Sequence, residues 1–415
     1  MLQPALSSAI DGRFRAMLGG GFVAEHVREF ADWLDQQGFR PYTIADLLRT
    51  LSAWTAWMRR AGFADTDLRA GLVAYRLELG RRAEPRDFNE FGQRSLVAAS
   101  RFMQFLQDRG IIEADAPPPS PTSNWPLLGE FRTWMREHRG LAESSLDEYQ
   151  RVLVGLVETV GDIPSLYTTE KLRDYVLERA RPFGIARTKS IVSAVRSFLR
   201  FLAATGRCRS GIEYAIPGFA CWRPSSVPKF LQPAEVERII GSCMSGRTGI
   251  RDKAVLLLLA RLGLRASEVA RLKFDDIDWP NGRIIVCGKG RHEGWLPLPQ
   301  EVGDAVLLYL HNARLRFPAT EVFLTVNAPL RPVSRLGITE IVRSALKRTG
   351  IKAPINGAHV LRHSVAASML QQGISLAGIG AVLRHRSPDT TANYAKVDFQ
   401  LLAEIAQPWP EAPSC

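Results

Sequence analysis

The sequence predicts a mainly α-helical protein with one small β-hairpin, in which helical domains precede a mixed α+β domain. Two observations carry this prediction. Apolar side chains recur at spacings of three and four over most of residues 23–206, which puts them on one face of successive helices. Residues 283–287 instead alternate like a strand, and residues 295–298 form a return strand after a tip at 288–294.

The first predicted domain, residues 1–115, is helical after a leader segment at 1–20. Strand signals are scarce in this region. Its apolar stripes are Val27, Phe30, Ala31 and Leu34; Leu47, Leu48, Leu51, Trp54 and Met58; and Leu96, Ala99, Phe102, Met103 and Leu106. The role of this domain stays open between additional DNA contact and contact with a partner protomer.

A proline-rich linker ends the first domain. Residues 116–124 read APPPSPTSN, an extended run that cannot hold a helix. A second helical domain follows at 125–206 and resembles the first in places. FADWL at 30–34 matches FRTWM at 131–135, and SLVAASRFMQFL at 95–106 matches SIVSAVRSFLRFL at 190–202. Duplication and a shared amphipathic pattern both explain these matches.

A second linker at 207–229, rich in glycine and proline, leads to a mixed domain at 230–407 and a tail at 408–415. Pro233 is placed to open a helix. Arg265 is predicted in a turn before a helix led by Ser267, with Glu268 at its first position. Gly373 is predicted to end the helix that follows His359. Further helices are expected at 252–261, 301–315 and 338–348, after Ser387, and at 399–406.

Composition favours a packed protein with a polyanionic partner. The chain has 415 residues, 46% of them hydrophobic, with a net charge of +12 and a pI of about 9.8. Nucleic acid is the simplest such partner, although many basic proteins bind nothing specific. The five cysteines are scattered without a zinc-like pair, which favours reduced thiols. No apolar run reaches membrane-spanning length and no secretory segment is recognisable, so we expect a cytoplasmic protein.

Six side chains in the last third of the chain supply the parts for attack on a phosphodiester. Arginine offers a planar fork of donors to phosphate oxygens, histidine moves protons near neutral pH, and tyrosine can be an oxygen nucleophile. No acidic cluster with metal-ligand spacing accompanies them, so we expect neither a metal nor another cofactor. The candidates are Arg265, Lys289, His359, Arg362, His385 and Tyr394.

The motifs around these residues occur in a characteristic order. GLRASE spans 263–268, GKGRHEGWLPLP spans 288–299, HVLRH spans 359–363, and LRHRS at 383–387 precedes Tyr394. Each motif alone is weak, but six positions in order are strong. In this arrangement the chain resembles a tyrosine recombinase of the phage integrase family.

The resemblance implies a mechanism and an architecture. Tyr394 would attack the scissile phosphate and form a 3′-phosphotyrosine, while Arg265 and Arg362 hold the non-bridging oxygens. His359 and His385 would complete the hydrogen bonds, and Lys289 would protonate the departing 5′-oxygen. Residues 125–206 would be the domain that clasps double-stranded DNA opposite the catalytic domain. The resemblance also implies a tetramer on two DNA sites, with tails that pack on neighbouring protomers.

Three residues near these motifs need separate predictions. Arg384 stands where the family usually has glycine, and it is expected to alter local backbone geometry or to add a phosphate contact. His363 is expected to brace its helix. Lys289 shares its hairpin with Arg291 and His292, which are competing candidates. On the second domain, basic residues could contact phosphate or form a solvated helix face: Arg179, Arg181, Arg187, Lys189, Arg196 and Arg200.

We therefore expect a site-specific DNA recombinase that integrates, excises or transposes a mobile element. Three alternatives stay open. The same chemistry would serve a chromosome-resolving recombinase, or a type IB-like topoisomerase that relaxes supercoils without site specificity. A catalytically inactive DNA-binding partner of another recombinase is the third. Whether other recombinases act as partners also stays open.

Overall fold

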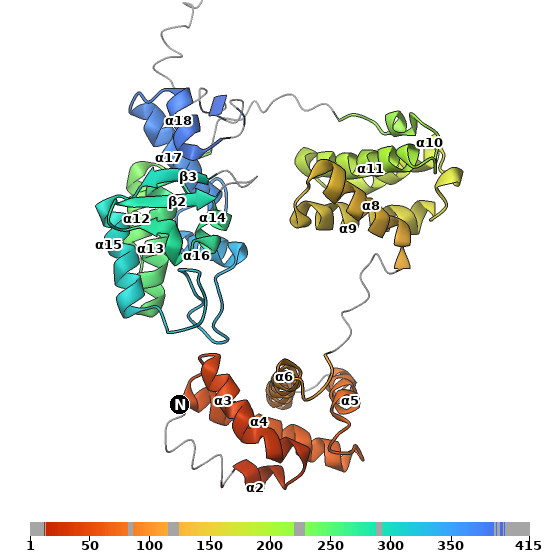
Figure 1. Ribbon diagram of the computed structural model, residues 1–415, viewed down its shortest axis with the longest axis vertical. Coiled ribbons are helices and arrows are strands. Elements are labelled where there is room, and N and C mark those ends of the chain that lie inside the picture. The colour runs from red at the N-terminus through yellow and green to blue at the C-terminus, as the bar shows by residue number, and fades with distance from the viewer. Residues whose placement is uncertain are drawn as a thin grey trace, which may run out of the picture. The chain divides into compact units, whose positions relative to one another are not determined.

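The structure, a computed structural model, describes residues 12, 14–81, 86–114, 124–219, 229–287, 293–385, 387, 391, 392 and 394. The chain divides into two compact units, residues Met1–Ile112 with Ser226–Cys415, and residues Glu113–Ser225. Helices dominate, and one small antiparallel sheet lies in the C-terminal part, so the predicted fold class is confirmed (Figure 1). No helix among the described residues is long and apolar enough to cross a membrane.

The N-terminal residues form a helical core of their own. Its helices are α2 (Arg15–Leu18), α3 (Phe22–Gln36), α4 (Pro41–Arg60), α5 (Leu68–Arg81) and α6 (Arg86–Asp108). The apolar stripe of α3 is buried at Val27, Phe30 and Leu34, as its spacing predicts. Phe14 and Leu18 are also buried in this core, although the sequence assigned them to a leader segment. They lie four positions apart and therefore share one helix face.

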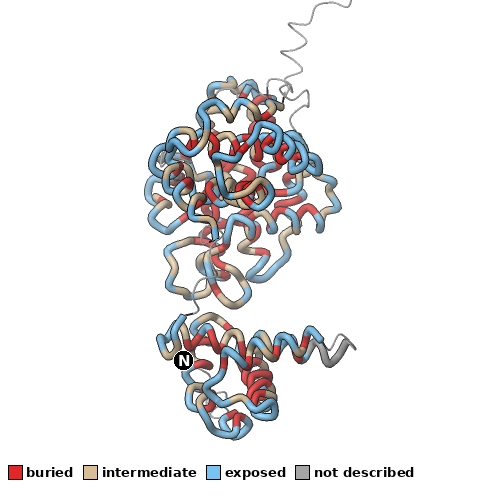
Figure 2. The backbone as a smooth tube through the Cα atoms, turned by 90° about the vertical axis from the view of Figure 1, so that its right-hand side faces the viewer, coloured by how far each residue is buried: buried red, intermediate tan, exposed pale blue. Residues whose placement is uncertain are grey.

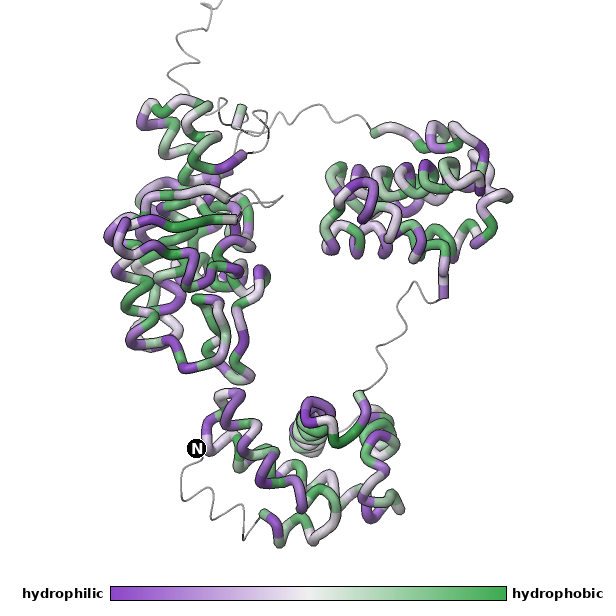
Figure 3. Tube along the Cα trace, in the orientation of Figure 1, coloured by the Kyte–Doolittle hydropathy of each residue, from purple (hydrophilic) through white to green (hydrophobic). Residues whose placement is uncertain are grey.

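In the residues that the structure describes, the second unit packs four α-helices around a separate core. They are α8 (Pro126–Arg139), α9 (Glu143–Val160), α10 (Thr169–Ala180) and α11 (Ile185–Ala204), with 3₁₀ turns at Pro164–Leu166 and Ile212–Ala215. Figure 3 shows hydrophobic positions interleaved with hydrophilic ones along these helices. Ile216 is buried in the same core, and Nη2 of Arg196 donates to its carbonyl at 2.8 Å. The start of the predicted linker at 207–229 is therefore ordered structure, because an apolar residue there reaches the core.

The C-terminal part is built on a helix that is buried from end to end of its apolar run. This helix, α13 (Arg247–Arg261), begins earlier than predicted, and its residues Val255 to Leu259 are fully buried. Figure 2 marks the buried stretches of the chain in red. Around it lie α12 (Pro233–Gly241), α14 (Ala266–Arg271), α15 (Gln300–Asn312), α16 (Arg335–Thr349) and α17 (His359–Gln371).

The sheet has the order β1-β2-β3 and is antiparallel throughout. Its strands are β1 (Ile277–Asp278), β2 (Arg283–Cys287) and β3 (Glu293–Pro297). Ile285 pairs with Trp295, which confirms the predicted hairpin. Its tip, with Lys289, lies outside the described residues, as do the predicted tail helix at 399–406 and most of the 116–124 linker.

The end of the domain carries a small separate core. Gly373, in a left-handed conformation with φ 78°, follows α17 and confirms the predicted helix end. After it, α18 (Leu376–Leu383) packs on α17, and Tyr394 is buried between the apolar residues of both helices. The nucleophile predicted from the sequence therefore lies against the helix that carries Arg362.

Candidate active site

The two predicted arginines meet where α14, α17 and α18 converge. Arg362 on α17 is only 3% exposed. Its Nη1 donates to the Gly263 carbonyl at 2.5 Å, and its Nη2 donates to the Leu383 carbonyl. Nη2 of Arg265 donates to the Arg384 carbonyl at 3.3 Å. Burial is the main cause that lowers the pKa of Arg362 to about 10, and the positive charge of Arg265 adds to this effect. The guanidinium of Arg362 therefore stays charged at neutral pH.

A buried carboxylate, Glu268, orients Arg265. Its Oε1 accepts from Nη1 of Arg265 at 2.7 Å, and its Oε2 accepts from the Arg265 backbone N–H at 2.8 Å. Glu268 is thus the third residue of α14 and closes its first turn, rather than standing at the first position as predicted. Burial works to raise the pKa of Glu268, but the backbone hydrogen bond and the charge of Arg384 outweigh it and hold that pKa below its usual value.

A surface pocket beside these arginines is lined by basic and neutral residues. Arg265, Arg335, His359 and Arg362 contribute its charged and titratable groups, and no acidic side chain is among the described residues that line it. The turn before α17 supplies Asn356, Gly357 and Ala358. Three arginines around one hollow suit a phosphodiester, whose oxygens accept several charge-assisted hydrogen bonds.

Sequence reasoning missed Arg335, which belongs to no recognised motif. It opens α16 directly after Ser334, whose side chain caps the helix. A cation at a helix N-terminus opposes the helix dipole and is locally unfavourable. An arginine at this position, directly after a capping serine, is the one local signal in the sequence that could have found it.

Tyr394 has a histidine partner that the sequence did not assign. Its hydroxyl lies 2.5 Å from Nδ1 of His363. Its ring lies parallel to that of His385, with centroids 6.4 Å apart. Burial raises the pKa of Tyr394 to about 12, so the phenol is protonated at neutral pH and needs a proton acceptor before it can attack. His363, predicted only to brace its helix, contacts the hydroxyl of the tyrosine that the sequence predicts as the nucleophile.

The three histidines of the site are neutral at pH 7. Desolvation, together with neighbouring positive charges, lowers the pKa of His359, and burial lowers that of His363. Burial and the charge of Arg362 lower the pKa of His385 to about 4. Nδ1 of His385 lies 2.7 Å from the Thr391 hydroxyl. Each neutral ring offers one donor and one acceptor, so His363 can accept a proton from Tyr394.

Five of the six predicted site residues lie in the described part of the chain, and the structure gathers them around the ends of α14, α17 and α18. Lys289 lies outside it, and so do its competitors Arg291 and His292. Within the described residues, no three His, Cys, Asp or Glu side chains lie close enough together to hold a metal ion.

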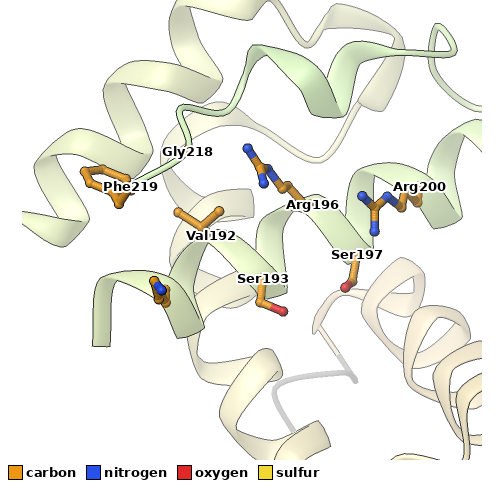
Figure 4. Close-up of a pocket in the computed structure, with 8 residues that line it drawn as sticks. Val192, Ser193, Arg196, Ser197, Arg200, Gly218 and Phe219 are labelled. Carbon is orange, nitrogen blue, oxygen red and sulfur yellow. The ribbon is translucent and has the colours of Figure 1, made fainter. Parts of the chain in front are cut away.

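A second basic surface lies on α11 of the other unit. Lys189, Ser193, Arg196, Ser197 and Arg200 line a hollow, to which Val192, Gly218 and Phe219 also contribute (Figure 4). Lys189 and Arg200 are exposed, whereas Arg196 is engaged with the Ile216 carbonyl and Arg187 pairs with Glu148. Lys189 and Arg200 are therefore the exposed cations of this hollow, although Nε of Arg200 lies 4.0 Å from Oε1 of Glu213. Arg179 and Arg181, the other two residues singled out on this domain, are exposed as well but do not line the hollow.

The fold and the site together define an enzyme class that breaks and rejoins DNA through a tyrosine. Residues 229–400 match the phage integrase family. The Sinorhizobium fredii (strain NBRC 101917 / NGR234) protein named as integrase/recombinase y4rA is 36% identical over 398 residues, which are 94% of this chain and 95% of that protein. The tyrosine recombinase XerD of Listeria innocua serovar 6a is 30% identical over 295 residues, 67% of this chain and 96% of XerD.

Two solved structures share the fold. The XerH site-specific recombinase bound to a palindromic difH substrate has a TM-score of 0.54 and 17% identity, and covers 82% of this chain and 96% of its own. A lambda integrase(75-356) dimer bound to a COC' core site has a TM-score of 0.51 and 17% identity, and covers 69% of this chain and 97% of its own. The chain belongs to the phage integrase family of tyrosine-type DNA recombinases.

Proposed function

We propose that the protein is a site-specific recombinase in which Tyr394 is the nucleophile and His363 its proton acceptor. The observation that carries the proposal is the 2.5 Å contact between the Tyr394 hydroxyl and Nδ1 of the neutral His363. The position of Arg362 supports this proposal, because Arg362 lies on the same helix as His363 and lines the surface pocket beside Arg265.

The reaction starts when the Tyr394 oxygen attacks the phosphorus and its proton passes to His363. The phosphorus–O5′ bond breaks, and the 5′-oxygen takes a proton from Lys289, the role that family resemblance gives this lysine. Arg265, Arg362 and His359 stabilise the charge that builds on the non-bridging oxygens. The new phosphotyrosine ester retains the bond energy, so a 5′-hydroxyl can attack it and rejoin the strand without ATP.

The DNA partner is proposed from fold and charge together. The XerH and lambda integrase structures each hold DNA, and they share this chain's fold. The α11 surface offers exposed Lys189 and Arg200 for backbone phosphates, which position a protein without reading sequence. Synapsis as a tetramer on two DNA sites, a partner recombinase and action in the cytoplasm belong to the same proposal.

A mobile-element role is the biological context that we propose. The y4rA alignment spans 94% of this chain, whereas the XerD alignment spans 67% of it although it covers 96% of XerD. The part of this chain that exceeds the length of XerD is therefore shared with the relative named as an integrase/recombinase. Residues 1–115 are proposed as an added helical domain, whose contact with DNA or with a second protomer is tested by deleting it and measuring each.

The test traps the covalent complex. Wild-type protein and Tyr394→Phe are incubated with sheared host DNA that carries random nicks. Where a nick lies close to the cut, the short strand with the 5′-hydroxyl diffuses away, so the strands cannot be rejoined and the covalent complex accumulates. Denaturing gels then show a shifted protein–DNA band for wild type and none for Tyr394→Phe, with equal DNA binding. A band from the Phe variant would overturn the assignment. Relaxation of any supercoiled plasmid would favour the topoisomerase alternative, and binding without a band would favour the inactive partner.

A further inference from the structure

Arg384 is the residue whose presence family resemblance does not explain. It follows α18 in the left-handed conformation, with φ 54° and ψ 51°, where helices commonly end in glycine. It is the sole non-glycine residue with positive φ in the part of the chain that the structure describes. A side chain at such a position is disfavoured, so its retention calls for a compensating contact.

The compensating contact is with Glu268. Nη2 of Arg384 donates to Oε2 of Glu268 at 2.8 Å, while Nη1 donates to the Val382 carbonyl at 3.2 Å. The Arg384 side chain is only 14% exposed. The expected change of backbone geometry is therefore wrong, since the backbone keeps the left-handed geometry typical of glycine. The guanidinium lies against a carboxylate, which is a contact that the sequence did not predict.

Glu268 is shared between two arginines. One of its oxygens holds Nη1 of Arg265, and the other accepts from the Arg265 backbone and from Arg384. A buried carboxylate held from two sides has one position, so the guanidinium that it orients also has one position. The positive charge of Arg384 also offsets the negative charge of Glu268. Without this offset, the carboxylate would weaken the electrostatic attraction between Arg265 and a phosphate.

Arg384 also contacts the strand that returns from the lysine hairpin. A Cβ built on Gly294 in β3 would lie 3.1 Å from Cδ of Arg384, so the side chain passes directly over this glycine. Gly294 has an ordinary negative or extended φ, so space rather than backbone conformation is what glycine supplies here. One side chain thus touches α14 through Glu268 and the hairpin through β3.

We propose that Arg384 is a positioning residue for strand cleavage. It holds Glu268 in place, and through Glu268 it orients Arg265. It also contacts β3, and thereby positions this strand relative to the pocket that Arg265, Arg335 and Arg362 line. This inference rests on the proposed function. Its chemistry is unchanged from that function, because Arg384 neither bonds to the DNA nor takes up a proton.

The experiment compares Arg384→Gly, Arg384→Lys and wild type on the randomly nicked host DNA. Arg384→Gly keeps the backbone carbonyl that Arg265 contacts and relieves the left-handed strain. We expect the rate of adduct formation at saturating DNA to fall about 10-fold, which is less than the roughly 10²-fold loss that a misplacement of about 1 Å can cause. The half-saturating DNA concentration stays within about twofold and the Tm stays equal or rises. Arg384→Lys restores part of the rate.

Two pairings separate this role from a general structural one. Glu268→Gln combined with Arg384→Gly is expected to be no slower than Glu268→Gln alone, because Arg384 acts through that carboxylate. Gly294→Ala slows the wild type but has no effect in the Arg384→Gly background, where the space is free. A wild-type rate for Arg384→Gly, or fully additive losses in both pairings, would overturn the proposal.

A readout without catalysis keeps the proposal distinct from the proposed function. Inorganic sulfate is used as a probe of the pocket that Arg265, Arg335 and Arg362 line. Sulfate that binds there stabilises the folded protein, and this effect is measured as a rise in Tm. Wild type and Tyr394→Phe are expected to show equal rises, and Arg384→Gly a smaller one. If wild type forms no adduct yet the sulfate difference holds, the proposed function fails while the positioning of Arg265 stands. Equal sulfate effects in wild type and Arg384→Gly would contradict the positioning role.

Discussion

The two basic surfaces of this protein hold their cations in opposite ways. On α11, Lys189 and Arg200 lie at the surface, and the Arg200 side chain is 48% exposed, with its Nε 4.0 Å from Oε1 of Glu213. At the candidate active site, Arg362 is buried and both its terminal nitrogens donate to backbone carbonyls. Solvated cations bind a polyanion loosely and with strong salt dependence, whereas fixed cations are already aimed at one phosphate. We therefore expect the first arrangement to contribute mainly to DNA affinity and the second mainly to the reaction rate.

Removing Arg362 should give the largest effect. Arg362→Ala takes away a donor to the phosphate and leaves the Gly263 and Leu383 carbonyls unpaired. We expect adduct formation to slow by about 10²–10³-fold and the free energy of unfolding to fall by about 1–3 kcal/mol. Single-turnover gels and denaturant titration measure the two losses.

The matched control is Arg261→Ala, also an arginine at the end of a helix. Arg261 donates to Glu237 and Glu301 at the surface and belongs to no candidate site. Its removal should cost at most about 1 kcal/mol, as exposed ion pairs do, and leave the rate unchanged. Equal rate losses for the two variants would contradict a specific role of Arg362 in the reaction.

His363→Ala should follow, with a loss of about 10²-fold, the usual contribution of a general base. Because burial lowers the pKa of His363 from 6.5, its neutral form persists below pH 6.5, and the wild-type rate should decline only in more acidic solution. His363→Gln keeps a hydrogen-bonding group that does not titrate, so this acidic decline should weaken. Rates measured from pH 5 to 8 test this. An unchanged profile in both variants would remove His363 from the mechanism.

The contacts of His363 and Arg384 are the part of the candidate site that could not be predicted from the sequence. The motif order was enough to single out Arg265, His359, Arg362, His385 and Tyr394, and the apolar spacing was enough for the helices and the hairpin. His363 adjoins Arg362 in the sequence, but only the fold of α17 against Tyr394 shows that its ring meets the hydroxyl. Likewise Arg384 read as a departure from a motif, and its partner Glu268 lies more than a hundred residues away in the chain. Long-range pairing of this kind leaves no local pattern.

The smallest effect is expected on α11. Replacing both Lys189 and Arg200 by alanine should weaken DNA binding and reduce the slope of log affinity against log salt by about 2, one for each lost phosphate contact. The adduct rate at saturating DNA should not change. Lys189→Arg with Arg200→Lys keeps both charges and should keep the slope. A slower rate at saturation, or an unchanged slope in the alanine variant, would contradict the division between the two surfaces.

The nucleophile itself offers the most direct test of the account. The covalent adduct formed on nicked DNA would be digested with nuclease and trypsin, and the peptide that carries the remaining nucleotide would be sequenced by mass spectrometry. We expect the phosphonucleotide on Tyr394. Modification of any other tyrosine, serine or histidine, in an adduct that Tyr394→Phe still forms, would contradict the assignment of the site.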